Sequence, residues 1–207
     1  MIIMLDQSVG KIYELQINNP TVEIQQFRTP LTQYKSGNIP YILDNGAYSG
    51  FDEKKFLRMA NASKNDIFCK YIVMPDVVGD AQSTYNQFRY YKNIIGLRPN
   101  QTAFVLQDGA ETGNMPDWDE FDCLFIGGST EFKMSGKAYI IAQEAIAQGK
   151  HVHVGRVNTP SRIVKWHGNC HSIDGSGISK YDHMFDKAVD LIIELNEIRQ
   201  SKLYEFV

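Results

Sequence analysis

The chain has 207 residues, of which 43% are hydrophobic and 22% charged, and its formal net charge is −3 at pH 7. This length suits one sizeable core better than two, so we expect a single domain over residues 1–207. The charge excludes a globally basic nucleic-acid-binding protein but leaves room for a local basic patch. No apolar run approaches the roughly 20 residues of a membrane helix, and no basic residue precedes the short apolar N-terminal run, so we expect a cytoplasmic protein.

Cysteine usage predicts neither a disulfide framework nor a zinc site. The chain holds three cysteines, Cys69, Cys123 and Cys170, and no CxxC pair. An odd number at these spacings is typical of inert, at least partly buried thiols.

Short apolar runs that end abruptly in Asp, Gly or Asn recur along the chain and predict about eight strands. Two weaker runs come first. The expected strands are, in chain order, 2–5, 22–27, 41–43, 71–74, 104–106, 124–126, 151–154 and 172–173.

Longer amphipathic stretches follow most of these runs and predict helices. The last of them has apolar residues at close to a 3.6-residue period, and Thr159-Pro160 is typical of a helix start, with the proline in the first turn. The expected helices are 53–61, 81–95, 135–148, 160–167 and 182–203.

Strands that alternate with helices predict a parallel α/β sheet, either closed as a barrel or open and doubly wound. A count near eight, and chemically active residues at many different strand ends, favour a compact TIM-like (β/α)8 barrel. An open sheet would gather such residues at one switch point, with a glycine-rich phosphate loop that this sequence lacks. Because such barrels usually have about 250 residues, some helices must be short or missing.

Three aspartates stand at the tips of apolar runs: Asp44, Asp76 and Asp174. In a (β/α) barrel these positions face the active site, although Asp followed by Gly or Asn-Gly is also good turn chemistry. Asp80 directly precedes a helix, which favours a capping role, whereas Asp108 is compatible with either role.

Other strand ends carry groups suited to binding. Gly127 and Gly128 would let a ligand approach the backbone, although a tight turn explains them as well. Arg156 and Arg162 flank the start of the helix at 160–167, which would suit a phosphate.

The pair His151 and His153 alternates along a strand, so both imidazoles lie on one face. No carboxylate completes a metal-binding set, so the pattern favours packing or support of a neighbouring site over metal binding. Trp166, His167 and His171 are expected to be structural.

Taken together, these strand ends resemble the tRNA-guanine transglycosylase superfamily, in particular its small phage and bacterial branch that places 7-deazaguanines in DNA. The resemblance covers residues 41–178 and six elements in order. The family's DSGGFQ-like, acidic-loop, VQGG-like, IGG and MGVGTP-like elements, and its last-strand aspartate, correspond to residues 44–49, 75–76, 105–109, 126–128, 154–160 and Asp174. The sequence departs from the family at two places: the family's CxCxxC…H zinc region is absent, and Gln107-Asp108-Gly109 replaces a Gly-Gly pair. The absence of the zinc region favours DNA, or another nucleic acid, over tRNA as the substrate.

The resemblance implies attack at an N-glycosidic carbon. It makes Asp174 the nucleophile that forms a covalent sugar–enzyme intermediate, and Asp44 the general acid–base. Asp76 would read a guanine-like edge with Gln107, Gly127 and Gly128, and Tyr48 or Phe51 would stack on the base. Phosphate contacts would come from Arg156, Arg162, Lys165, Lys133 and Lys137.

No cofactor is implied, and a purine-like base and a nucleic acid are the expected partners. Two alternatives stay open. The same carboxylates would serve a DNA glycosylase that excises a base by hydrolysis, and a non-catalytic barrel could bind a nucleotide or a protein partner. A homodimer is also left open.

Overall fold

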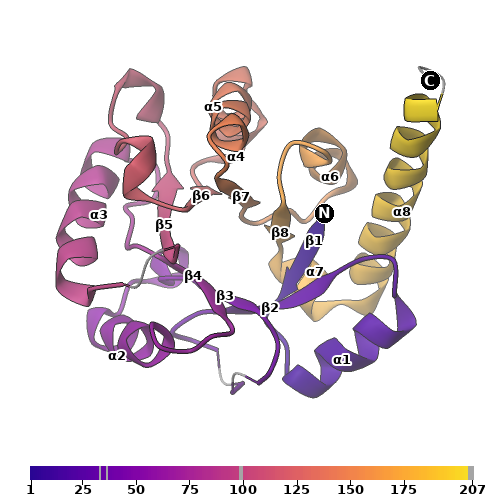
Figure 1. Ribbon diagram of the computed structural model, residues 1–207, viewed down its shortest axis with the longest axis horizontal. Helices are drawn as coiled ribbons and strands as arrows, with labels where there is room; N and C mark the ends of the chain where they lie inside the picture. The colour runs from indigo at the N-terminus through magenta and orange to yellow at the C-terminus, as the bar shows by residue number, and fades with distance from the viewer. Residues whose placement is uncertain (33, 36, 98–99, 205–207) are drawn as a thin grey trace.

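The protein is a closed parallel β-barrel with helices around its outside. A computed structural model describes residues 1–32, 34–35, 37–97 and 100–204, and Figure 1 shows the strands at the centre of that arrangement. Within these ranges the barrel has the strand order β1 to β8, and β1 pairs with β8 to close it. The strands are β1 (Ile2–Leu5), β2 (Ile24–Arg28), β3 (Tyr41–Leu43), β4 (Cys69–Val73), β5 (Thr102–Leu106), β6 (Cys123–Ile126), β7 (His151–Val154) and β8 (Ser172–Asp174).

The predicted barrel is therefore confirmed, and each expected run is a strand. The bounds differ by no more than two residues at either end, and β4 ends at Val73 rather than continuing to Met74. Asp174 is the last residue of β8 instead of the first residue after it.

The five expected helices are present and three more occur in the described ranges. The expected ones are α2 (Glu53–Ser63), α3 (Ala81–Ile95), α5 (Gly136–Ala147), α6 (Pro160–Trp166) and α8 (Asp182–Tyr204); the additional ones are α1 (Val9–Asn18), α4 (Thr130–Met134) and α7 (Ser176–Lys180). The helices α4 and α7 have five residues each, too few to show a helical period in the sequence. None of the helices in these ranges is long and apolar enough to cross a membrane.

Two connections explain how a barrel fits into so short a chain. The described part of the β2–β3 connection holds no helix, and the β5–β6 connection has only 3-10 turns at Ala110–Thr112 and Trp118–Glu120. The shortening that a barrel of this length requires therefore occurs in these two connections.

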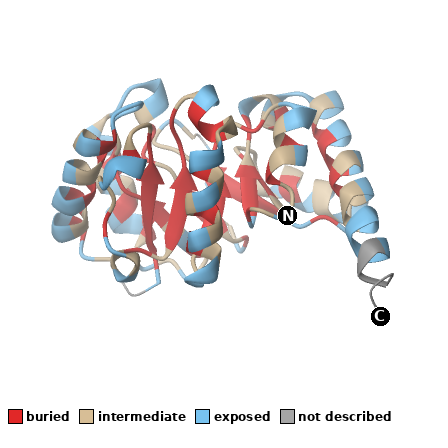
Figure 2. Ribbon diagram, turned by 90° about the horizontal axis from the view of Figure 1, so that it is seen from above, coloured by how far each residue is buried: buried red, intermediate tan, exposed pale blue. Residues whose placement is uncertain are grey.

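The core has two layers, because alternate residues of each strand point in opposite directions. One set packs against the helices, and Figure 2 shows that the strands are buried while the outer faces of the helices are exposed. The smaller set fills the barrel interior: Met4, Phe27, Ile42, Val73, Ala103, Val105, Cys123 and Phe125. All three cysteines are buried.

The same alternation brings the strand-end residues together. Two positions beyond an inward-facing residue is again an inward-facing position, so Ile42 is followed by Asp44, Val105 by Gln107, and Phe125 by Gly127. The strand ends therefore converge above the apolar barrel interior.

Candidate active site

A cavity opens at the carboxyl ends of the strands, with an empty volume of about 470 Å³ counted to its mouth. All eight residues expected to form a site line it, from six different strand ends. They are Asp44, Tyr48, Asp76, Gln107, Gly127, Gly128, Arg156 and Asp174. Its other walls include Phe27, Val78 and Phe125, to which no site role was assigned from the sequence. They also include Asn45, Val105 and Gly155, which lie in the family-like elements, and Lys133, which was expected as a phosphate contact.

Asp44 is a carboxylic acid prepared to hold a proton near neutral pH. Its Oδ2 accepts a hydrogen bond from the backbone N–H of Gly46 at 3.0 Å. Gly46 has a φ of +78°, a left-handed conformation that glycine adopts without strain. Burial, and then the negative charge of Asp76, raise the pKa of Asp44 to about 7. At neutral pH this group can both give and take a proton.

Asp76 is held on both of its oxygens. Asn45 donates from Nδ2 to Oδ1 at 2.7 Å, and Gln107 donates from Nε2 to Oδ2 at 2.6 Å. Burial raises the pKa of Asp76 to about 6, partly offset by these two bonds. Each oxygen retains a lone pair that can accept from a ligand.

Gln107 and Asn45 orient Asp76 from opposite sides. The Oε1 of Gln107 accepts from the N–H of Gly79 at 2.9 Å, so its amide is engaged at both ends within the protein. Asn45 also donates to the carbonyl of Met74 at 2.8 Å. In the sequence, Asn45 belongs to an Asp-Asn-Gly stretch typical of a turn, and its position directly after Asp44 is the signal that could have identified it.

Asp174 faces Asp44 and Asp76 from the closing strand β8. Its Oδ1 lies 3.0 Å from Nε2 of His153 and accepts from the backbone N–H of Arg156 at 3.3 Å. Arg156 has a φ of +60°, unusual for a residue with a side chain. This conformation directs the Arg156 N–H at the carboxylate.

Glycines at two strand ends keep the cavity open. A Cβ atom at Gly127 would lie 2.7 Å from Cγ1 of Val105 and 2.8 Å from Nε2 of Gln107. A Cβ atom at Gly155 would lie 2.7 Å from the Phe125 ring. These distances are shorter than the contacts that real Cβ atoms make, so a side chain at either glycine would require the cavity wall to shift.

Tyr48 and Arg156 meet at the mouth of the cavity. The Arg156 guanidinium lies 4.1 Å from the centre of the Tyr48 ring and donates to the carbonyl of Gly128. Tyr48 is 68% exposed, so its ring is available for stacking. Phe51 was expected as an alternative stacking residue, but it packs against Phe56 and Tyr91 and is not part of the cavity wall.

The cations expected to contact phosphate lie in different environments. Lys133 is buried, and its Nζ donates to the carbonyl of Gly155 at 2.8 Å. Burial, followed by the charge of Arg156, lowers the pKa of Lys133 to about 8. Phe132, the neighbour of Lys133 on α4, is buried in the core, and Lys133 lines the cavity instead of reaching solvent.

The other cations divide by position. Lys137 pairs with Glu111 at 2.6 Å, and Lys165 lies over the Tyr139 ring, outside the cavity wall. Arg162 donates to the carbonyl of Arg156 at 2.9 Å and therefore lies beside the cavity mouth.

The remaining strand-end predictions have structural outcomes. Asp80 caps α3 by accepting from the N–H of Ser83 at 2.9 Å, as expected. Asp108, for which both roles were open, accepts from the N–H and the hydroxyl of Ser129 and so fixes the start of α4. Thr159 is the N-cap residue of α6 and Pro160 lies in its first turn. In the described part of the chain no group of His, Cys, Asp and Glu side chains could hold a metal ion.

Comparisons with known proteins support the fold and add nothing on activity. The structure is similar to a citrate lyase from Burkholderia xenovorans, with a TM-score of 0.50 over 92% of this chain and 76% of that one. The two sequences are 10% identical, so the likeness concerns the fold alone. No family model matches the chain, and no curated protein matches it.

Proposed function

We propose that this protein is a nucleic-acid base-exchange enzyme, similar to the guanine and 7-deazaguanine transglycosylases, that acts on DNA in preference to tRNA. The observation that carries the proposal is the meeting of two carboxylates with different environments, Asp44 and Asp174, at one cavity. Asp44 has a pKa near 7 because it is buried beside Asp76, which is what a general acid–base requires.

In the first half of the reaction a carboxylate oxygen of Asp174 attacks C1′ of the sugar. The C1′–N bond breaks, its electron pair leaves with the base, and the base takes a proton from Asp44. In the second half the incoming base loses a proton to Asp44 and attacks C1′, and the ester electrons return to Asp174.

Asp76 is suited to reading the base. Its two carboxylate oxygens, held by Asn45 and Gln107, would accept from two adjacent N–H donors on a guanine-like edge. Phe27, Val105 and Phe125 provide apolar surface for a flat ring. A base can enter this cavity only when it is unstacked, so we expect a single-stranded or flipped substrate.

The test is base incorporation measured by mass spectrometry. The protein is incubated with guanine-containing DNA and a free 7-deazaguanine base, and the nucleosides are analysed after digestion. We expect the deazaguanine nucleoside in the product, and a protein–DNA adduct on a denaturing gel when the incoming base is left out. The Asp174→Asn variant should lose both, whereas Asp80→Asn, a matched change at an exposed strand-end aspartate, should keep both.

Other outcomes would redirect or overturn the proposal. Free guanine with abasic DNA and no incorporation would make the protein a hydrolytic glycosylase. Incorporation into tRNA alone would reverse the choice of polymer. A full rate with Asp174→Asn would exclude the covalent route, and no change in DNA or tRNA would leave a non-catalytic binding barrel.

A further inference from the structure

Below Asp174, a line of hydrogen-bonded groups runs down the barrel interior and takes no part in the proposed chemistry. His153 lies 3.0 Å from Asp174, Ser172 lies 2.8 Å from His153, and His151 lies 2.7 Å from Ser172. These groups occupy alternate positions of the neighbouring strands β7 and β8, so all of them face the barrel axis.

His153 is fixed in the interior. It has no exposed surface and stacks on the Phe27 ring at 5.5 Å with an angle of 8° between the planes. The centre of the Phe125 ring lies 4.6 Å from the centre of the His153 ring. A ring held in this way cannot rotate out of line with Asp174.

Hydrogen counting assigns the tautomer of a neutral His153. The Ser172 hydroxyl has a single hydrogen and contacts two imidazoles, so it donates to one and accepts from the other. The Asp174 carboxylate accepts only, so the one N–H of a neutral His153 is on Nε2, and Nδ1 accepts from Ser172. His151 then donates from Nε2 to the Ser172 oxygen.

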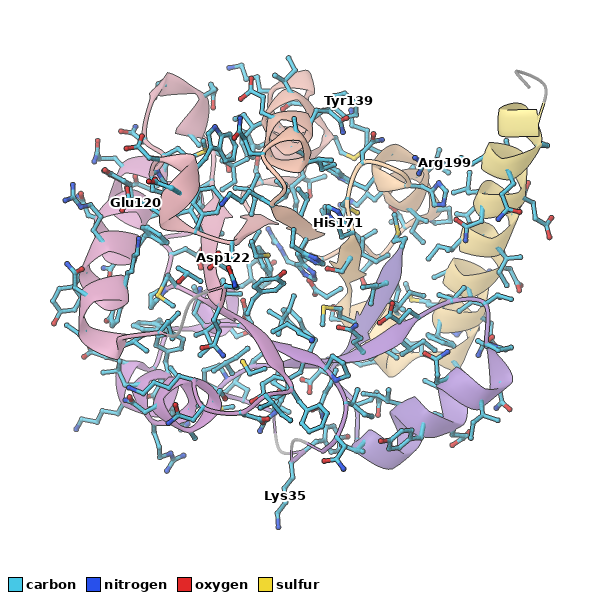
Figure 3. The ribbon with its side chains drawn as sticks, viewed as in Figure 1. Lys35, Glu120, Asp122, Tyr139, His171 and Arg199 are labelled. Carbon is cyan, nitrogen blue, oxygen red and sulfur yellow. The ribbon has the colours of Figure 1, made fainter. Side chains whose placement is uncertain are left out.

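The far end of the line is consistent with neutral rings. Burial lowers the pKa of His151 to about 3, which keeps that ring uncharged. His151 stacks on His171 at 4.9 Å, and His171, labelled in Figure 3, accepts at Nδ1 from the N–H of Val152. Every hydrogen bond of the line is satisfied without a charge on an imidazole.

We propose that His153 is the positioning residue of Asp174, that Ser172 and His151 hold it as the Nε2–H tautomer, and that Oδ2 of Asp174 is the attacking oxygen. Both donors to the carboxylate, His153 and the Arg156 N–H, bind Oδ1. No described residue donates to Oδ2, which is left free on a carboxylate that lines the cavity.

This inference rests on the proposed function and makes its first step specific. Oδ2 forms the ester bond to C1′ while the C1′–N electrons leave with the base, which takes its proton from Asp44. Oδ1 becomes the ester carbonyl and continues to accept from His153. His153 keeps its proton throughout, so it neither gives nor takes one in the reaction.

The first test measures the tautomer directly by nitrogen NMR on protein labelled at histidine. We expect the neutral Nε2–H pattern for His153 in the wild-type protein. The Ser172→Ala variant removes the donor to Nδ1, so we expect a mixture of tautomers there. An imidazolium or an Nδ1–H pattern in the wild-type protein would overturn the proposal.

The second test uses single-turnover formation of the covalent protein–DNA adduct. His153→Phe keeps a ring between Phe27 and Phe125 but has no donor, and we expect adduct formation to slow by about 100-fold, the effect of a misplaced reacting group. His153→Gln can donate from its amide at the Nε2 position and should recover most of that loss. Because His153 does not line the cavity, DNA affinity should stay unchanged in both variants.

A matched control separates this role from general histidine effects. His167 bonds Asn196 at 2.9 Å on the outer side of the barrel, so His167→Gln should leave the adduct rate unchanged. A wild-type rate with His153→Phe, while exchange itself occurs, would refute the positioning role alone. If the wild-type protein exchanges no base, the proposed function fails, and the NMR measurement still tests the hydrogen-bonded line.

Discussion

Arg156 combines two functions that separate at the level of single atoms. Its backbone N–H binds Asp174, while its guanidinium donates to Gly128 and covers Tyr48. The first function needs the left-handed φ of +60°, and the second needs the side chain. A substitution at this position removes the guanidinium and keeps the backbone N–H.

Glycine and alanine at this position should therefore differ in stability but not in binding. Arg156→Gly adopts the left-handed conformation without strain, so we expect it to be about 1 kcal/mol more stable than Arg156→Ala. Both variants lack the guanidinium and should bind DNA more weakly than the wild-type protein, with a smaller dependence on salt. Urea denaturation and DNA titrations at two salt concentrations measure these effects. Equal stabilities would show that the strain is not borne at Arg156.

At the residue scale, the sequence predicted which side chains reach the cavity but not how they are held. Asp44, Asp76 and Asp174 were predicted because each ends an apolar run. The support of Asp76 by Asn45, and of Asp174 by His153, involves partners 31 and 21 positions away in the chain. No local pattern encodes a contact over such separations.

At the element scale, Ser135 joins α4 to α5. Its hydroxyl accepts from the N–H of Ala138 at 3.3 Å as the N-cap of α5, and donates to the carbonyl of Phe132 at 2.7 Å at the end of α4. The sequence placed a helix start at Ser135, and the structure adds that a second helix ends there. Because α4 carries Lys133, this junction fixes one wall of the cavity.

Loss of this cap should destabilise the protein measurably. We expect Ser135→Ala to lower the free energy of unfolding by about 1 kcal/mol, because the first turn of α5 loses its acceptor. Ser135→Asp retains an N-cap acceptor and should recover part of the loss. Urea midpoints of the variants measure the difference, and an unchanged midpoint for Ser135→Ala would mean that water replaces the hydroxyl at no cost.

In the described ranges, every helix longer than ten residues was predicted from the sequence. The helices α2, α3, α5 and α8 were predicted within two residues at each end from their length and apolar spacing, and α6 was predicted from its Thr-Pro start. The helix α1 was missed although Ser8 caps it and Val9, Ile12 and Tyr13 follow helical spacing. The helices α4 and α7 depend on tertiary packing, for which a five-residue stretch gives no signal.

At the scale of the whole molecule, the closed barrel concentrates negative charge at its centre. Burial raises the pKa values of both Asp44 and Asp76, so the native state holds protons that the unfolded chain has released. Between about pH 4 and pH 7 these two groups therefore bind fewer protons in the unfolded chain than in the native protein. Their contribution to the free energy of unfolding falls across this window as the pH rises, whereas the lowered pKa of His151 contributes in the opposite direction.

The Asp44→Asn variant should remove the part of this pH dependence that comes from Asp44. Asparagine cannot ionise, so we expect the variant to be more stable than the wild-type protein by about 1–3 kcal/mol at pH 8, with little difference at pH 4. Urea denaturation at both pH values measures this, with base exchange assayed in parallel and expected to be lost. An equal gain at both pH values would show that the gain has a cause other than ionisation of Asp44.

The sequence by itself determined the barrel, the order of its strands and eight of the residues at the cavity. Strands alternate in hydrophobicity and end at characteristic residues, and the carboxyl ends of parallel strands lie on one side of a barrel. Each of these rules applies to a short stretch of sequence, so it can be used without the tertiary structure. Only the tertiary structure decided the direction in which Lys133 points, the supports of Asp76 and Asp174, and the raised pKa values. Each of these depends on burial and on contacts between residues far apart in the chain, which exist only in the folded barrel.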